Sequence, residues 1–252
     1  MRLVYGVGFL RLAAAFVPLQ APRGVVSFEL DDVLYEASAV RDGVRGELQP
    51  WLASRLSAAP PDAQAMMDAV RAAGAEFGMM MPGVRAIQRE AMKKTIESAG
   101  ASEDDEEMVN QAMAIWLQAY DSWAEQTLAA DAVAAIEALR ERGFGCCAVT
   151  AGLGDSERMP TLAPLLDFTL STCDFTVPAT DAWDVALQVA PAKYDGGRSW
   201  IHVGGATEGG LAPAAKAGLK TVALGDVTAP DTTVRIARLS ELPDVIDGLV
   251  AA

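Results

Sequence analysis

Residues 25–35 read VVSFELDDVLY, and this stretch decides the fold. Its first part, Val25 to Leu30, is β-branched and apolar and predicts a short buried strand. The acidic pair Asp31-Asp32 follows and predicts a polar loop at the carboxyl end of that strand. In an open α/β sheet, ligands bind at this edge, so the loop is the first place to look for a functional site.

The chain turns helical after this loop. Between Ser38 and Thr127 it is rich in Ala, Met and Leu, and the apolar residues recur three and four positions apart. The pattern is broken at Pro60-Pro61, at Pro82-Gly83 and around Gly100. These breaks predict four helices in one block.

From Ala130 onward, strands and helices alternate. The expected strands are Phe144 to Val149, Phe168 to Ser171, Trp200 to Val203 and Thr221 to Leu224. The expected helices run through Ala138-Leu139 and near Leu162 to Leu166, Asp181 to Val189 and Leu211 to Ala217. Such alternation predicts right-handed crossovers. The expected fold class is therefore α/β, a Rossmann-like parallel sheet with helices on both faces, interrupted early by the helical block.

The composition indicates a folded globular protein. Of the 252 residues, 51% are hydrophobic and 21% are charged, which is enough to bury an α/β core with an inserted helical part. The formal net charge of -14 argues against nucleic acid and anionic lipid as partners, because both attract Lys and Arg. No segment outside the N-terminal stretch approaches the roughly 18–20 apolar residues of a membrane span.

The cysteines and the single histidine point away from metal chemistry. Cys146, Cys147 and Cys173 lack metal-ligand spacing and are typical of buried thiols in a reducing compartment. His202 lies in an apolar run, so a metal site built on histidines is excluded. We expect His202 to be a packed strand residue.

Residues 1–24 carry three arginines and no acid, with a short apolar run from Leu3 to Leu10. This is the profile of a targeting segment, and Ala13 to Pro18 resembles the cleavage context of plastid-targeted proteins in algae with secondary plastids. Arg11 interrupts the apolar run, and a first strand or packed arm explains the same residues. The expected location is soluble and intracellular, in a plastid or otherwise in the cytoplasm.

Three segments together resemble motifs of the haloacid dehalogenase-like (HAD-like) superfamily. Residues 28–35, FELDDVLY, resemble the first motif, commonly FDxDDTLY. Residues 148–152, AVTAG, resemble the second motif. Residues 203–205, VGG, followed by residues 214–221, AAKAGLKT, resemble the fourth motif. The resemblance runs from about Val25 to the C-terminus.

The resemblance also implies how the chain is divided. A Rossmann-like core would comprise residues 25–37 and 128–252. The helical block of residues 38–127 would be a four-helix cap of the C1 type, inserted directly after the first motif. Residues 1–24 would be an N-terminal arm or a targeting remnant.

The motifs imply roles for particular residues. In such families the first Asp attacks phosphorus and binds Mg²⁺, and the Asp two residues later is the general acid/base. The implied catalytic residues are therefore Glu29 and Asp31, and the implied phosphate-binding residues are Thr150, Ala151 and Gly204. A Thr before a glycine-containing turn is equally a structural cap, and the acidic pair is equally a polar turn.

The sequence departs from the family's pattern at several of these positions. Glu29 replaces the first Asp and is one methylene longer, and a misplacement of about 1 Å can cost roughly a hundredfold in rate. Val177 stands at the place of the third-motif lysine, and Gly205 and Gly210 stand at the places of the fourth-motif acids. Several parts of the phosphoryl-transfer site are therefore missing at once.

These departures leave few ligands for a metal. Mg²⁺ is usually held by one or two carboxylates together with substrate phosphate. The remaining candidates are Glu29, Asp31 and Glu208. We expect neither a bound metal nor a cofactor, and Mg²⁺ only if the protein is active.

Three functions are compatible with these residues. The first is a catalytically degenerate HAD-like protein, a pseudo-phosphatase that acts as a protein-binding or structural module with another protein or complex as its partner. The second is a divergent Mg²⁺-dependent phosphatase or hydrolase of small phosphorylated metabolites. The third is a noncatalytic binder of a phosphate ligand, held by Thr150 and the amides of the glycine loops.

Overall fold

The computed structural model describes most of the core and much of the helical block. The described residues are 22–56, 84–100, 106–150, 154–171, 183, 199–205, 211–227 and 232–251. The N-terminal segment up to residue 21 and the helix expected near Asp181 to Val189, apart from Trp183, lie outside them. No helix in these ranges is long and apolar enough to cross a membrane.

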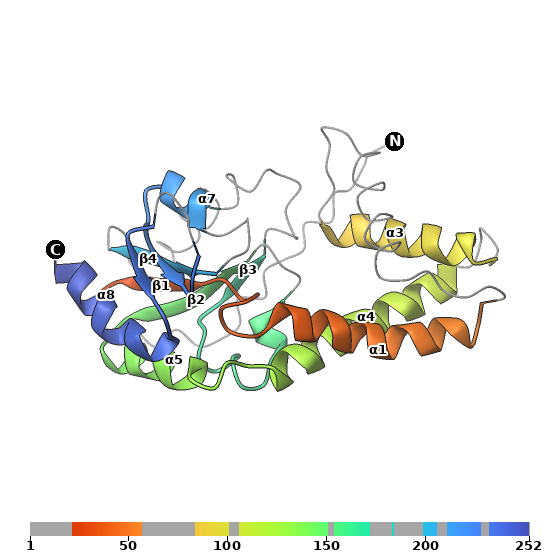
Figure 1. The fold of residues 1–252 in the computed structure, drawn as a ribbon, viewed down its shortest axis with the longest axis horizontal. Helices are drawn as coiled ribbons and strands as arrows, with labels where there is room; N and C mark the ends of the chain where they lie inside the picture. The colour runs from red at the N-terminus through yellow and green to blue at the C-terminus, as the bar shows by residue number, and fades with distance from the viewer. Residues whose placement is uncertain are drawn as a thin grey trace, which may run out of the picture.

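Six parallel strands form one sheet in the described residues, in the order β3-β2-β1-β4-β5-β6 (Figure 1). The strands are β1 (Val25–Phe28), β2 (Gly145–Thr150), β3 (Thr169–Ser171), β4 (Trp200–Gly204), β5 (Lys220–Leu224) and β6 (Val234–Ile236). The α/β, Rossmann-like fold class expected from the sequence is therefore confirmed.

Strand β1 lies in the middle of the sheet. It pairs with β2 on one side and β4 on the other, so that Phe28 is opposite both Ala148 and Val203. Every residue of β1 is buried, as expected for a strand covered on both faces. Val26 and Phe28 belong to one hydrophobic cluster and Val25 to another, which places the two clusters on opposite faces of the sheet.

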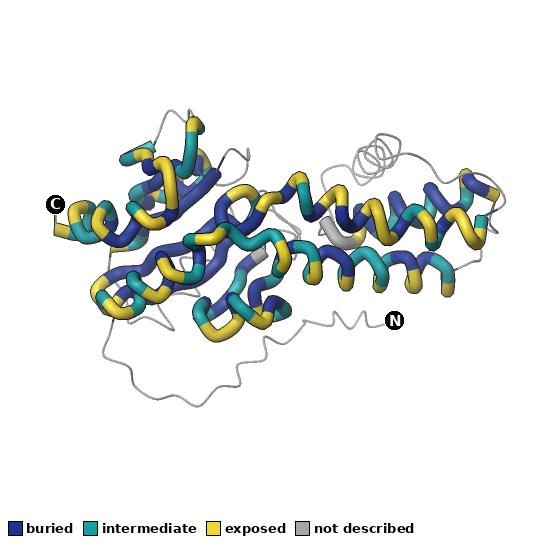
Figure 2. The backbone as a smooth tube through the Cα atoms, turned by 60° about the horizontal axis from the view of Figure 1, so that its bottom comes forward, coloured by how far each residue is buried: buried dark blue, intermediate teal, exposed yellow. Residues whose placement is uncertain are grey.

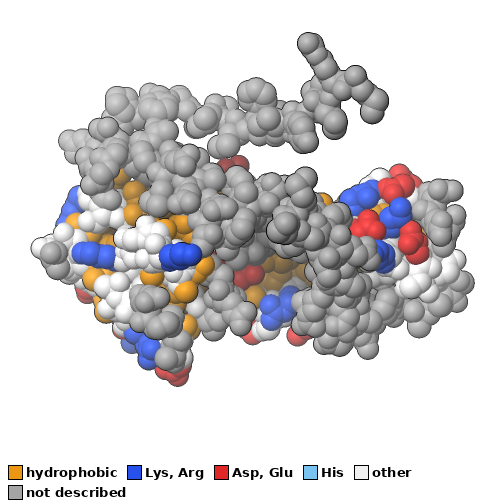
Figure 3. Space-filling model, turned by 90° about the horizontal axis from the view of Figure 1, so that it is seen from above, with side chains coloured by type: hydrophobic (Ala, Val, Ile, Leu, Met, Phe, Trp, Pro, Cys, Tyr) orange, Lys and Arg blue, Asp and Glu red, His pale blue; other side chains and the backbone are white. Residues whose placement is uncertain are grey.

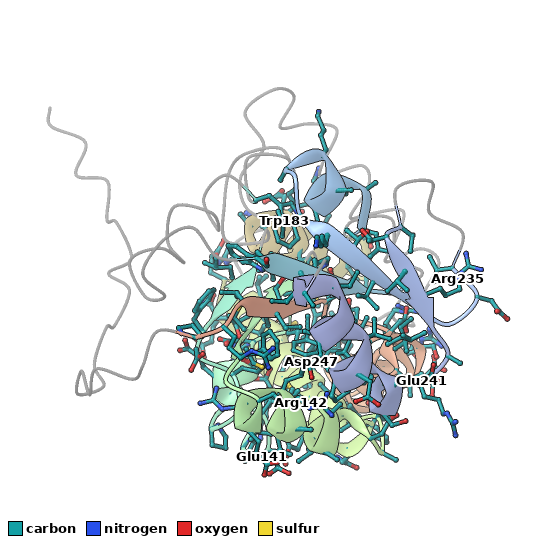
Figure 4. The ribbon with its side chains drawn as sticks, turned by 90° about the vertical axis from the view of Figure 1, so that its left-hand side faces the viewer. Glu141, Arg142, Trp183, Arg235, Glu241 and Asp247 are labelled. Atoms are coloured by element: carbon teal, nitrogen blue, oxygen red, sulfur yellow. The ribbon has the colours of Figure 1, made fainter. Side chains whose placement is uncertain are left out.

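Helices cover both faces. Helices α5 (Ala132–Glu141) and α8 (Leu242–Ala251) lie together on one face, and α7 (Leu211–Lys216) packs on β4 and β5 on the other (Figure 1). Figure 4 shows Arg142, just after α5, beside Asp247 of α8. Their charged atoms are 2.8 Å apart, and Arg142 also lies 2.9 Å from Asp244. This half-exposed ion-pair network fastens the C-terminal helix to α5.

Helices α1 (Ala37–Ala53), α3 (Val84–Ser98) and α4 (Glu106–Gln126) pack together beside the sheet and are called the helical unit below. Figure 2 shows buried positions recurring along one side of α1 and α4. The inner parts of α1 and α4 share the main core, and their outer parts form a separate cluster with α3. The remaining parts of the expected four-helix block, residues 57–83 and 101–105, lie outside the described residues.

Charged side chains of both signs gather on the outer part of the helical unit (Figure 3). Arg89 of α3 forms an ion pair with Glu106 at the start of α4, and Lys93 lies 3.6 Å from the same carboxylate. These pairs are exposed, and such pairs contribute little to stability.

A glycine sets how closely α1 and α4 approach. A Cβ built at Gly43 of α1 would lie 2.1 Å from Cδ2 of Trp123 of α4. The Trp123 indole also donates a hydrogen bond of 2.8 Å to Glu47, one turn further along α1. Trp123 therefore fills the space that any other residue at position 43 would need.

One expected helix is wrong, and the structure contains elements that the sequence did not suggest. The helix expected near Leu162 to Leu166 is wrong: residues 160–165 are successive turns. Leu162 and Ala163 both bond to the carbonyl of Met159, but Pro164 has no N–H to continue a helical ladder. Strand β6 and helix α8 lie in a region for which the sequence suggested no element. The helix through Ala138-Leu139 and the one at Leu211 to Ala217 are present as α5 and α7.

His202 is a fully buried residue of β4. Its Nδ1 lies 3.0 Å from the Ser27 hydroxyl, which also accepts a hydrogen bond of 2.9 Å from the Trp200 indole. Trp183, labelled in Figure 4, packs edge-on against the imidazole with ring centroids 4.6 Å apart. Burial lowers the pKa of His202 to about 3, and a hydrogen bond with the backbone of Ser27 only partly opposes this shift. The imidazole is therefore neutral at physiological pH, as expected for a packed strand residue.

The thiol of Cys146 is not reactive either. Cys146 and Cys147 are buried in β2, and Cys173 lies outside the described residues. Burial raises the pKa of Cys146 to about 12. A thiol in this state is not a nucleophile near neutral pH.

We expect Gly43→Ala to destabilise the protein by about 1–3 kcal/mol, because the added methyl group overpacks the contact with Trp123. Gly46→Ala is the matched control in the same helix, since nothing lies within 4 Å of its Cβ position. It should instead stabilise the protein by about 0.5–1 kcal/mol through helix propensity. Urea denaturation followed by circular dichroism measures both, and equal effects would contradict the close approach of α1 and α4.

We expect acid to remove stability through His202. The unfolded chain takes up the imidazole proton below about pH 6.5, whereas the folded protein resists it down to a pKa of about 3. Unfolding free energies of the wild type and His202→Leu should be compared between pH 7 and 3.5. The wild type should lose stability relative to the variant by up to about 1.4 kcal/mol per pH unit, and a pH-independent difference would contradict the buried neutral state.

Candidate functional site

The three motif segments meet at the carboxyl edge of the sheet. Phe28 lies opposite Ala148 and Val203 in the two neighbouring strands, so the residues that follow these positions leave the sheet side by side. They are Glu29 after β1, Thr150 at the end of β2 and Gly204 at the end of β4. The expected convergence of these residues therefore follows from the register of three parallel strands.

Glu29 is buried, with 1% of its surface exposed. Its backbone N–H donates a hydrogen bond of 2.8 Å to the carbonyl of Val203, which holds the start of the loop against β4. Its side-chain Oε1 accepts a hydrogen bond from the hydroxyl of Thr150, which is also buried. The two side chains for which the family resemblance implied catalysis and phosphate binding, Glu29 and Thr150, are thus bonded to each other.

Asp31 is partly buried and bonded to the helical unit. Its Oδ1 accepts a hydrogen bond of 2.8 Å from the hydroxyl of Tyr120 in α4. The hydroxyl of Tyr35 lies 3.2 Å from the hydroxyl of Tyr120. Because the single hydroxyl proton of Tyr120 is used on Asp31, Tyr35 must be the donor to Tyr120. The direction of the network is therefore Tyr35 to Tyr120 to Asp31.

Tyr35 is held as a neutral donor. Burial raises the pKa of Tyr35 well above its ordinary value, and the neighbouring Tyr120 and Asp31 raise it further. Gly154 makes room for the ring, because a Cβ there would lie 2.2 Å from the Tyr35 hydroxyl oxygen. Gly154 belongs to a glycine loop that the sequence suggested as a phosphate-binding loop, but its contact with Tyr35 was not expected. No sequence signal pointed to Tyr120, because its partners are distant along the chain, whereas Tyr35 stands inside the segment that resembles the first motif.

Asp32 shapes the loop rather than the chemistry. It has a φ of 59°, in the left-handed region that is rare for residues other than Gly, Asn and Asp. Its Oδ1 accepts a hydrogen bond of 3.0 Å from the N–H of Ala37, the first residue of α1. Glu36 occupies the N-cap position of α1 and makes no side-chain cap hydrogen bond, so Asp32 takes over the cap by accepting from the first N–H of the helix.

The glycines after β4 are packed closely. A Cβ at Gly204 would lie 2.8 Å from the side chain of Leu211 in α7. A Cβ at Gly205 would lie 3.0 Å from the carbonyl oxygen of Asp32 and 3.3 Å from Cγ2 of Val33. Gly205, where the family resemblance implied a metal-binding acid, therefore adjoins the loop after β1, and a side chain there would require that loop to shift by a few tenths of an ångström.

Few metal ligands lie among the described residues. These residues contain no group of three or more His, Cys, Asp and Glu side chains that could hold a metal. Oε1 of Glu29 and Oδ1 of Asp31 accept hydrogen bonds from hydroxyl groups, and Gly205 supplies no side-chain oxygen. Of the oxygen ligands that Mg²⁺ takes, the described part of the site therefore supplies the carboxylates of Glu29 and Asp31 and no third acidic side chain.

The rest of the sequence-predicted site lies outside the described residues. This applies to Ala151 in the second motif, Val177 in the third, and Glu208 and Gly210 in the fourth. Of the predicted residues, the structure brings together Glu29, Thr150 and Gly204, while Asp31, two residues after Glu29, is bonded to Tyr120.

The parallel sheet and the helices on its two faces define an α/β protein. Its candidate site lies where the loops after β1, β2 and β4 leave the carboxyl ends of the strands. No protein-family model matches the sequence, and no curated protein matches it. Comparison of the structure with solved structures does find matches, and these identify the fold.

The similar structures are hydrolases of one superfamily. A 2-haloacid dehalogenase from Pseudomonas syringae pv. Tomato DC3000 has a TM-score of 0.74 and 23% identity, over 90% of this chain and 99% of that chain. The putative HAD-hydrolase YfnB from Bacillus subtilis, bound to magnesium, has a TM-score of 0.62 and 13% identity, over 90% and 99%. CbbY from Rhodobacter sphaeroides, in complex with phosphate, has a TM-score of 0.57 and 12% identity, over 87% and 96%.

The chain therefore has the fold of the haloacid dehalogenase-like superfamily. It spans nearly the whole length of these structures, so the likeness includes more than the sheet. At identities of 12–23% the likeness concerns the fold, while the activity has to be argued from the site.

Substitutions at Asp32 should separate its two structural roles. Asp32→Ala loses the cap on α1 and places a Cβ residue without a compensating side chain at positive φ, and should cost about 2 kcal/mol. Asp32→Gly loses only the cap and should cost about 1 kcal/mol. Asp32→Asn keeps an acceptor oxygen and tolerates positive φ, so it should cost least. Urea denaturation gives the order, and an Asn variant as unstable as the Ala variant would contradict this account.

Proposed function

We propose that this protein is a catalytically degenerate HAD-like protein that serves as a protein-binding or structural module. One observation carries the proposal. Both carboxylates of the first-motif loop accept hydrogen bonds from the protein's own hydroxyl groups, Glu29 from Thr150 and Asp31 from Tyr120. These bonds stabilise the loop and direct the polar groups of the site toward one another.

The chemistry of the superfamily needs a different arrangement. In-line transfer of a phosphoryl group requires a carboxylate placed about 3–3.5 Å from phosphorus and cations to neutralise the transferred oxygens. Glu29 is longer than the Asp of the motif and is bonded to Thr150, the hydroxyl that would hold the phosphate. Val177 stands at the lysine position, and Gly205 at the position of a metal-binding acid. The nucleophile, phosphate and metal functions are thus weakened together.

The proposed partner is another protein or complex. The net charge of -14 disfavours nucleic acid, so an acidic α/β core with a rigid helical unit is better suited to docking on a protein. In this proposal the helical unit is the cap of the fold, inserted over residues 38–127. If residues 1–24 act as a plastid address, the partner is a plastid complex; otherwise the protein acts in the cytoplasm.

A second candidate is a divergent hydrolase, and the comparisons favour it. The similar structures include a 2-haloacid dehalogenase, a magnesium-bound HAD-hydrolase and a phosphate-bound protein. Asp31 is kept at the general acid position and its side chain is only partly buried. A noncatalytic phosphate binder built on Thr150, Ala151 and Gly204 would share this site and differ by binding without turnover.

We expect the purified protein to hydrolyse neither an aryl phosphate, with or without Mg²⁺, nor 2-chloropropionate. The revertant Glu29→Asp/Val177→Lys/Gly205→Asp restores the motif residues, and Tyr120→Phe added to it frees Asp31. Phosphate and halide release measure turnover, and Asp31→Asn in each background is the control. Turnover by the natural protein that disappears in Asp31→Asn would overturn the noncatalytic proposal, and saturable binding of inorganic phosphate without turnover would favour the phosphate binder.

A further inference from the structure

The last part of α4 contacts the core through polar side chains at three points. The side chains are Tyr120, Asp121 and Glu125, called the α4 clamp below. They reach the loop after β1 and the segment after β2, which are separate parts of the chain. The clamp thus joins the helical unit to two edges of the candidate site.

The first contact is made by Tyr120, which is 7% exposed. Its hydroxyl donates a hydrogen bond to Asp31 at 2.8 Å, and Tyr35 packs against its ring at an interplanar angle of 86°. Tyr120 belongs to the same hydrophobic cluster as Leu34 and Tyr35. The contact therefore combines ring packing with a charge-assisted hydrogen bond, which is stronger than one between neutral groups.

The other two contacts reach the segment after β2. Oδ2 of Asp121 lies 3.1 Å from Nε of Arg158, and Asp155 lies 3.5 Å from the same atom. Glu125 accepts two hydrogen bonds from Thr161, one from its hydroxyl and one of 3.1 Å from its backbone N–H. The charged groups of Asp121 and Arg158 are only 20% and 32% exposed, so salt screens this pair less than a surface pair.

The two chain segments that connect the helical unit to the core are also bonded to each other. The N–H of Ala129 donates to the carbonyl of Leu34 at 2.8 Å, and the N–H of Glu36 donates to the carbonyl of Thr127 at 3.4 Å. Tyr35 and Leu128 form an antiparallel bridge between them. We call this pair of segments, residues 34–36 and 127–129, the hinge ladder.

We propose that the α4 clamp holds the helical unit and the core together as one rigid body and keeps Asp31 occupied by Tyr120. Movement of the helical unit away from the sheet would have to break the clamp and strain the hinge ladder at the same time. The structure of the similar YfnB protein is described as revealing interdomain movement, and the clamp would suppress such movement here. The proposal does not depend on whether the site turns over substrate.

Hydrogen–deuterium exchange of the hinge ladder tests the proposal. Peptides covering residues 33–37 and 126–130 would be followed in the full-length protein by mass spectrometry, with peptides of β2 as internal reference. In the wild type the ladder should be protected to a degree similar to β2. In the clamp variant Tyr120→Phe/Asp121→Asn/Glu125→Ala, exchange of the ladder relative to β2 should be at least about tenfold faster, since opening costs fewer contacts.

Two matched variants distinguish the clamp from general effects on α4. Glu106→Gln breaks the exposed ion pair with Arg89 at the other end of the same helix and should leave exchange of the ladder unchanged. Glu125→Gln keeps an acceptor oxygen for Thr161 and should resemble the wild type, whereas Glu125→Ala alone should exchange faster. If the triple variant does not fold, the comparison of Glu125→Ala with Glu125→Gln tests the clamp.

Two results would overturn the proposal. One is a wild-type hinge ladder that exchanges as fast as unprotected amides, because the helical unit would then move freely. The other is a clamp variant, or Glu125→Ala, whose exchange relative to β2 equals that of the wild type. Neither result bears on turnover, so failure of the clamp and failure of the noncatalytic proposal remain distinguishable.

Discussion

The pairing of β1 with both of its neighbours is the constraint on which the rest of the structure depends. A strand in the middle of a parallel sheet is hydrogen-bonded on both sides and covered on both faces, so its side chains must be small or apolar. Polar residues can follow only where the strand ends. Phe28 is in register with Ala148 and Val203, and this brings Glu29, Thr150 and Gly204 to one place. That convergence is a consequence of topology and persists whether or not the site is catalytic.

Once carboxylates are placed at such an edge, they need hydrogen-bond donors. A buried polar group without a partner costs more than a satisfied hydrogen bond contributes, so the loop is stable only if each acid is bonded. Here the donors come from the protein itself, from Thr150 for Glu29 and from Tyr120 for Asp31. Asp32 uses its carboxylate to cap α1. Under the proposed function, these acids stabilise the loop rather than take part in catalysis.

The helical unit is coupled to the core through the same loop. The chain leaves the core at Tyr35 and returns at Leu128, and these residues pair in an antiparallel bridge. The inner parts of α1 and α4 belong to the hydrophobic cluster that covers the sheet. Gly43 allows the two helices to approach closely enough for Trp123 to fill the space between them. Packing at the base of the helical unit and polar contacts at the site thus both restrain movement of the helical unit away from the sheet.

The sequence by itself determined the strands, because a run of buried β-branched residues has a local signature, and the order of elements then fixed the parallel sheet and the convergence at its edge. It failed where a local pattern was interrupted: Pro164 ends a helical pattern at residues 160–165, and the charged Arg235 stands between the β-branched residues Val234 and Ile236 of β6. Only the tertiary structure decided that Tyr120 bonds to Asp31 and Glu125 to Thr161. The first pair is separated by 89 residues, and no periodicity encodes which distant side chain a carboxylate will meet. Such contacts are selected by packing of whole elements, so they become visible only when the fold is assembled.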